Sequence, residues 1–128
     1  MEQTTIVIVE DDSLLAQALT AFVEDLGYRV VATADTEQSA IDAICERQPD
    51  VVLMDVELVD GNGVGAAIRI RQSTNVPIVF CSAYAARGVI QSAVRAVGNT
   101  ALIGKPFDET DLANLLANVI QKSGLARS

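Results

Sequence analysis

The sequence predicts an α/β fold, a doubly wound five-stranded parallel sheet with helices on both faces. Five short apolar runs alternate along the 128 residues with five segments whose apolar residues recur at helical spacing. Strands joined through helices run parallel, and right-handed crossovers place the helices on both faces of the sheet. Half of the residues are hydrophobic and only 4% are aromatic, so we expect a core of aliphatic side chains.

The first half of the chain contains three predicted strands and two predicted helices. The run from Thr5 to Val9 is continuously apolar, as expected of a strand buried on both faces, and two further strands are predicted: Arg29 to Thr33 and Val51 to Asp55. Between the first two, apolar residues at spacings of four and three form one face of a helix: Leu15, Leu19, Phe22 and Leu26. Gly27 is placed to end that helix. The second helix ends before Pro49 and has a shorter apolar face: Ala40, Ile41 and Ile44.

The second half continues the alternation. A glycine-rich turn from Asp60 to Gly63 precedes a short helix through Ala67, Ile68 and Arg71. Two further strands are predicted: Ile78 to Cys81, after Pro77, and Thr100 to Gly104. The helix between them ends at Gly98 and has a long apolar stripe: Val89, Ile90, Ala93, Val94 and Val97. The last helix is strongly amphipathic: Leu112, Leu115, Leu116, Val119 and Ile120.

Length, charge and hydropathy limit the number of domains and the kinds of partner that the chain is expected to have. We expect one domain over residues 1–128, with a core of about 5–122 and a short tail over 123–128. The net charge of −8 argues against direct binding to nucleic acid. The first five residues, Met1 to Thr5, are acidic and polar, unlike a signal peptide, and no apolar run approaches the ~20 residues of a membrane span. The two cysteines lack metal-binding spacing, so we expect reduced thiols in a cytoplasmic protein. From the missing apolar span we expect no membrane contact.

Polar residues stand where four of the predicted strands end. Glu10 and Asp11 follow the first strand, Asp55 ends the third, Ser82 follows the fourth and Lys105 follows the fifth. Ligands bind at the carboxyl ends of strands in parallel sheets, so we expect these residues to share one cleft.

The acids in that cleft predict a metal-dependent phosphoryl site. Two carboxylates ~4 Å apart repel by about 4 kcal/mol at an effective dielectric near 20, so either a proton or a cation must offset them. Oxygen ligands without histidine favour Mg²⁺ or Mn²⁺ over zinc. Asp55 is then a candidate nucleophile that accepts a phosphoryl group, while Lys105 and Ser82 bind its oxygens.

The same set of residues resembles the receiver domain of two-component response regulators, from about Ile6 to Gln121. That resemblance implies the flavodoxin/CheY-like fold with strand order 2-1-3-4-5. It makes Asp55 the phosphoacceptor, Ser82 the switch hydroxyl and Lys105 the phosphate-pairing lysine. It also implies a Mg²⁺ site formed by these groups: the carboxylates of Glu10, Asp11 and Asp55 and the backbone carbonyl of Glu57. Lys105-Pro106 resembles the cis peptide of the family, and Asp12 is expected to cap the first helix rather than bind metal.

The resemblance further implies a stand-alone phosphorylation-activated switch that is not an enzyme beyond its own phosphotransfer and autodephosphorylation. Its expected donor is a histidine kinase or a histidine phosphotransfer protein. Its expected output is altered binding of a downstream target through the face of the fourth helix, fifth strand and last helix, as a monomer or a phosphorylation-dependent homodimer. Two alternatives stay open: a small aspartate-nucleophile phosphohydrolase with Glu57 as its acid/base, and a degenerate receiver that binds partners without phosphorylation.

Two positions depart from the family pattern, and one run resembles a different motif. Val59 stands where the family usually has proline, and Leu102 stands where many members carry an aromatic switch residue. As a hypothesis, Glu57 and Tyr84 flank the phosphoryl group and influence its hydrolysis. The run Gly61 to Ala66 fits a dinucleotide-binding fingerprint, but it does not follow a strand directly, so we interpret it as a turn.

Overall fold

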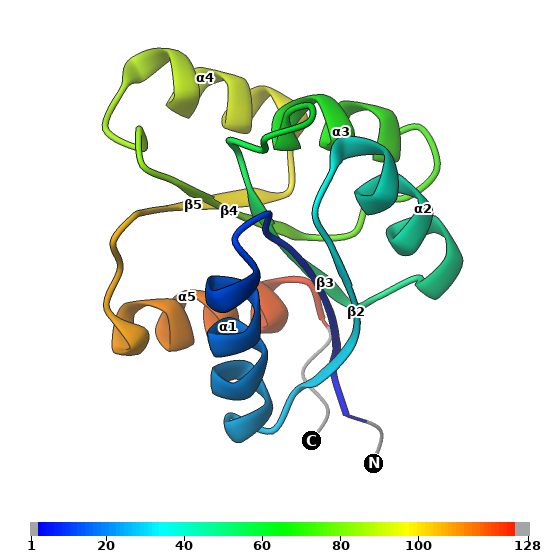
Figure 1. The fold of residues 1–128 in the computed structure, drawn as a ribbon, viewed down its shortest axis with the longest axis vertical. Coiled ribbons are helices and arrows are strands. Elements are labelled where there is room, and N and C mark those ends of the chain that lie inside the picture. Colours follow the sequence, from blue (N-terminus) through cyan, green and yellow to red (C-terminus); the bar gives the residue numbers. More distant parts are fainter. Residues whose placement is uncertain (1–2, 125–128) are drawn as a thin grey trace.

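The computed structural model describes residues 3–124, which alternate strictly between strand and helix (Figure 1). Their bounds are β1 (Thr5–Val9), α1 (Ser13–Asp25), β2 (Arg29–Ala34), α2 (Glu37–Arg47), β3 (Val51–Asp55), α3 (Gly63–Ile70), β4 (Ile78–Ser82), α4 (Gly88–Val97), β5 (Thr100–Gly104) and α5 (Glu109–Lys122). All strand pairs are parallel, and the strand order is β2-β1-β3-β4-β5. The predicted fold class and strand order are therefore confirmed.

The sheet separates two hydrophobic layers (Figure 1). Helices α1 and α5 cover one face, and α2, α3 and α4 cover the other. Successive side chains of a strand point to opposite faces, so Ile6 and Ile8 of β1 join the layer of α1 and α5, while Val7 and Val9 join the other. Burial on both faces explains why the sequence of this strand is continuously apolar.

Three of the apolar residues named for the predicted helices are exposed in the structure. Ile68 is 56% exposed, Val89 is 73% exposed and Leu26 is 41% exposed. Consecutive helical residues are about 100° apart around the axis. The inward line of α4 therefore runs through Ile90 and Val94 and leaves Val89 in solvent, as Ile68 is left beside the buried Ala67. Leu26 and Val89, which the apolar spacing placed on the inward faces of their helices, are therefore wrong as core predictions.

The helix ends follow the local sequence. Asp12 caps α1 by accepting hydrogen bonds from the amides of Leu14 and Leu15 (3.0 and 3.2 Å). Gly27 follows α1 with a φ of +99°, a left-handed conformation that favours glycine. Of the predicted tail, residues 123 and 124 lie within the description and residues 125–128 lie outside it. Within residues 3–124, no helix combines the length and the hydropathy that a membrane crossing needs.

Candidate functional site

The predicted site residues come together at the carboxyl ends of four neighbouring strands. Glu10 follows β1, Asp55 ends β3, Ser82 ends β4 and Lys105 follows β5. The peptide between Lys105 and Pro106 is cis, as expected. Asp55 ends its strand as predicted, yet its side chain is only 4% exposed, so it lies deeper than the rim of the fold. The parallel sheet thus gathers the charged groups into one buried cluster.

Lys105 lies between the two buried carboxylates. Its Nζ donates to Oε1 of Glu10 at 2.8 Å and to Oδ2 of Asp55 at 2.7 Å. Burial alone would lower the pKa of Lys105, but the hydrogen bonds to Asp55 and Glu10 outweigh it and raise that pKa above its ordinary value. The lysine that was expected to bind phosphate therefore serves in this structure as the cation that offsets the crowded acids.

Glu10 stays electrostatically strained despite this partner. Burial raises the pKa of its carboxyl above 4.5, the charge of Asp55 adds to the rise, and the bond to Lys105 opposes it. The amide of Asp12 donates to Oε2 of Glu10 at 3.1 Å. Burial first and the charge of Asp55 second thus disfavour the charged form of Glu10, and a cation bound beside it would favour that form again.

The acids fit a hard divalent cation. Glu10, Asp11 and Asp55 each offer a carboxylate oxygen, and these oxygens lie within 4.8 Å of one another. An all-oxygen set without histidine or thiolate is the chemistry that Mg²⁺ and Mn²⁺ prefer. The geometry thus suits the predicted metal ligands among the side chains, and the carbonyl of Glu57 stays a prediction.

Asp11 has a hydrogen-bond partner that the sequence did not reveal. The backbone amide of Val59 donates to Oδ2 of Asp11 at 2.6 Å, although the Val59 side chain is 91% exposed. A proline at this position has no N–H to donate. The departure from the family pattern therefore adds a contact to a candidate metal ligand, through a backbone atom that no side-chain pattern encodes.

Glu57 contacts both sides of the site. Its amide donates to Oδ1 of Asp55 at 3.1 Å, and its carboxylate crosses to the end of β4. There Oε2 accepts from the hydroxyl of Ser82 at 2.6 Å, and Oε1 accepts from the amide of Ala83 at 3.1 Å. The amide of Tyr84 donates to the Ser82 oxygen at 2.9 Å. The Tyr84 ring itself is half exposed and lies 4.7 Å from the Arg87 guanidinium.

A second missed residue, Glu37, holds the loop between β3 and α3. Its Oε1 accepts from the amide of Asn62 at 2.9 Å, and its own amide donates to the carbonyl of Asp60 at 3.0 Å. Gly61 has a φ of +97°, and a Cβ added there would lie 2.4 Å from Cβ of Glu37. A Cβ on Gly63 would lie 2.1 Å from the Asp55 carbonyl oxygen. These glycines permit close packing, which supports the interpretation of the run as a turn.

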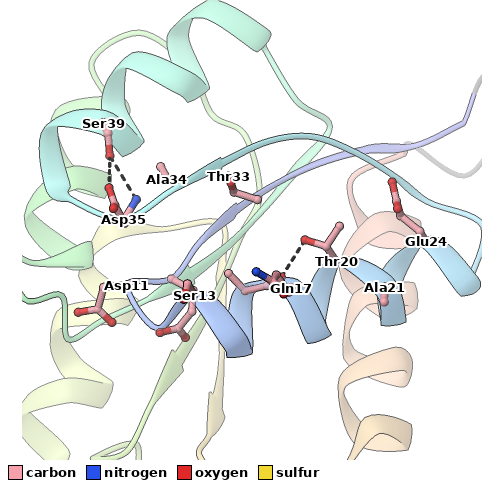
Figure 2. Close-up of a pocket in the computed structure, with 12 residues that line it drawn as sticks. Asp11, Ser13, Gln17, Thr20, Ala21, Glu24, Thr33, Ala34, Asp35 and Ser39 are labelled. Atoms are coloured by element: carbon pink, nitrogen blue, oxygen red, sulfur yellow. Dashed lines mark hydrogen bonds between the residues drawn. The ribbon is translucent and has the colours of Figure 1, made fainter.

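A groove of about 560 Å³ opens beside the acids, between α1 and the end of β2 (Figure 2). Figure 2 shows Gln17 and Thr20 of α1 on one side and Thr33 and Asp35 on the other, with Asp11 at one end. Glu10 and Asp11 line it, whereas Asp55, Ser82 and Lys105 do not. The groove therefore reaches two of the candidate metal ligands, Glu10 and Asp11, but not Asp55.

Comparison with known proteins identifies the family. The family model described as "Response regulator receiver domain" matches residues 6–117. The chain is 33% identical over 107 residues to the transcriptional regulatory protein PdtaR of Mycobacterium tuberculosis, covering 84% of this chain and 52% of PdtaR. It is 31% identical over 119 residues to the phyllosphere-induced regulator PhyR of Methylorubrum extorquens, covering 91% of this chain and 43% of PhyR.

A solved structure agrees with these sequence matches. The receiver domain of Erythrobacter litoralis PhyR has a TM-score of 0.83 and 30% identity, covering 94% of this chain and 92% of that chain. The chain spans about half the length, or less, of PdtaR and of the Methylorubrum PhyR. The likeness is therefore to the receiver part of such regulators.

Proposed function

The chain belongs to the family of response regulator receiver domains, and from this membership we propose that it is a signalling switch phosphorylated on Asp55. The observation that carries the proposal is the buried cluster in which Lys105 bonds Asp55 and the candidate metal ligands lie next to it. A buried carboxylate with these neighbours suits nucleophilic attack on phosphorus, because a carboxylate is able to form an aspartyl phosphate.

The proposed reaction transfers one phosphoryl group from a donor histidine. A carboxylate oxygen of Asp55 attacks phosphorus, a P–O bond forms, and the P–N bond to the donor imidazole breaks as that ring takes back its electron pair. Lys105 keeps its positive charge and pairs with the phosphoryl oxygens, while Ser82 donates a hydrogen bond to one of them. Bound Mg²⁺, held by Glu10, Asp11, Asp55 and the Glu57 carbonyl, would neutralise charge on the transferring group.

We place the protein in a two-component pathway in the cytoplasm. A histidine kinase or a histidine phosphotransfer protein supplies the phosphoryl group, and a downstream protein target reads the changed conformation, with α4, β5 and α5 as the expected binding face. One solved relative is described as the anti-anti-sigma factor PhyR of Bartonella quintana, a precedent for protein partners. We propose that residues 1–128 form one receiver domain, that it contacts neither nucleic acid nor a membrane directly, and that it catalyses only its own phosphotransfer and autodephosphorylation.

Intact mass spectrometry after incubation with acetyl phosphate and Mg²⁺ tests the proposal. We expect a labile addition of one phosphoryl group that is lost in Asp55→Asn and in the presence of EDTA. An unmodified protein under all conditions would instead indicate a binding module that works without phosphorylation. Catalytic turnover of small phosphate esters, dependent on Glu57, would indicate a phosphohydrolase.

A further inference from the structure

The hydrogen-bond donors around Asp55 are already in use. Among the described residues, every buried polar side-chain atom has a hydrogen-bond partner. Two donors stand at the end of β4, the strand that pairs with Asp55: the Ser82 hydroxyl and the Ala83 amide, and both donate to the carboxylate of Glu57. A phosphoryl group on Asp55 therefore meets an occupied site rather than a set of free donors.

The occupation is exclusive because each donor has one hydrogen. A serine hydroxyl carries a single proton, and the oxygen of Ser82 already accepts from the Tyr84 amide. Donation to Oε2 of Glu57 at 2.6 Å leaves no hydrogen for a phosphoryl oxygen. The Ala83 amide, which donates to Oε1 at 3.1 Å, is committed in the same way.

Charge also prevents the two acceptors from sharing these donors. A phosphoryl group and the Glu57 carboxylate are both anionic, and two like charges repel strongly at contact distance in a partly buried site. Ser82 is fully buried, whereas Glu57 is only half-buried. The Glu57 side chain thus has solvent to turn into when it is displaced, and Ser82 does not move aside as easily.

We propose that the Glu57 carboxylate is a built-in competitor for the phosphoryl site, holding Ser82 and Ala83 until a phosphoryl group on Asp55 displaces it. This inference rests on the proposed function. It assigns Glu57 a role before phosphorylation. The side chain opposes entry of the phosphoryl group, and it accepts the hydrogen bonds of the Ser82 hydroxyl and the Ala83 amide while Asp55 is unphosphorylated.

Binding of beryllium trifluoride, an anionic mimic of a phosphoryl group, tests this role in the presence of Mg²⁺. We expect Glu57→Ala to bind the mimic at least about tenfold more tightly than wild type, because a charge-assisted bond no longer competes for the donors. Glu57→Gln keeps an acceptor oxygen without the charge, so its affinity should lie between the two. Glu46→Ala, which removes an exposed acid at the C-terminal end of α2, should behave as wild type. The titration is followed by fluorine NMR.

Two further readouts separate this role from a structural one. The Ala83 amide resonance should shift in ligand-free Glu57→Ala, since it loses its acceptor, and the initial rate of phosphorylation by acetyl phosphate should rise. Equal or weaker mimic binding in Glu57→Ala and Glu57→Gln, with wild type still phosphorylated, would overturn the inference and leave the proposed function standing. If neither wild type nor Glu57→Ala takes up phosphate or the mimic, the proposed function fails as well.

Discussion

Val59 shows how a single backbone atom is able to influence a charged site. Its side chain points into solvent, yet its amide donates to Asp11 at 2.6 Å. Hydrogen bonds from an outer shell orient metal ligands and influence the affinity of the metal. Asp11 is therefore held in place by the loop that follows β3, the same loop whose next turn is anchored by Glu37.

Val59→Pro should weaken Mg²⁺ binding by about tenfold, the lower end of the effect of removing an outer-shell partner. Isothermal titration calorimetry measures the Kd directly. Val59→Ala keeps the amide and is the matched control, for which we expect the wild-type affinity. If Val59→Pro binds Mg²⁺ as tightly as Val59→Ala, the amide has no part in orienting Asp11.

Glu10→Gln should stabilise the metal-free protein at pH 7 by about 1 kcal/mol, a typical size for one substitution. The pKa of Glu10 is raised in the folded state, mainly by burial, so the folded protein binds this proton more tightly than the unfolded chain does. The stability that proton binding contributes is present below the unfolded-state value of 4.5 and is lost as pH rises through the higher folded-state pKa.

The gain in free energy of unfolding should therefore shrink as the pH falls from 7 towards 4.5. Urea unfolding at several pH values, with EDTA present, measures it for wild type and Glu10→Gln. Glu46→Gln, in the exposed part of α2, is the control and should show no such pH-dependent difference. A difference between wild type and Glu10→Gln that stays constant over this range would contradict the argument.

At the scale of elements, the loop between β3 and α3 contributes several of the hydrogen bonds that position the site residues. Glu57 and Val59 contact Asp55, Ser82 and Asp11 from this loop. Its far end is fixed to α2 by Glu37 and by the closely packed Gly61. A change in the packing of α2 against the loop is thus passed to the groups that surround Asp55.

Gly61→Ala should destabilise the fold by about 2 kcal/mol, the combined scale of backbone strain and overpacking. Its φ of +97° is strained for alanine, and the new Cβ would lie 2.4 Å from Cβ of Glu37. Gly27→Ala is the matched control, because Gly27 has a φ of +99° and nothing lies within 4 Å of its added Cβ. Thermal unfolding followed by circular dichroism should show the larger loss for Gly61→Ala. An equal loss of stability in the two variants would mean that the Glu37 side chain moves away from the new Cβ at little cost.

Sequence patterns were sufficient for the elements but not for their orientation. Periodicity located all the helices within a few residues, because burial of one face requires it. It did not distinguish Leu26 and Val89 from true core residues, since the inward direction of a helix depends on what it packs against. Strand ends likewise predicted the cluster of Glu10, Asp55, Ser82 and Lys105. The roles of Glu37 and of the Val59 amide depend on loop geometry, which side-chain chemistry does not encode.

For the whole molecule, the acidic cluster is expected to couple metal binding to stability. The net charge of the chain is −8, and Glu10, Asp11 and Asp55 concentrate part of it at one end of the sheet. A cation that binds only the folded state stabilises it by mass action. The fold and the metal site are therefore expected to respond together to changes in ion concentration.

Mg²⁺ should raise the Tm by several degrees, because a concentration one hundred times above the Kd adds about 2.7 kcal/mol of stability. Differential scanning calorimetry in matched buffers with Mg²⁺ or EDTA measures the shift. Asp11→Asn lacks one candidate ligand and should lose most of it, while sodium chloride of equal ionic strength serves as the control. The same rise with sodium chloride would indicate general charge screening.

The two cysteines differ in a way that has a practical consequence. Cys45 is exposed near the end of α2, whereas Cys81 is buried on β4 beside the Asp55 backbone, and burial raises the pKa of its thiol to about 12. Alkylating reagents react with the thiolate, so the folded chain offers them Cys45 alone. A fluorophore attached there would leave the acid cluster chemically untouched, which makes the natural sequence suitable for single-site labelling without prior removal of a cysteine.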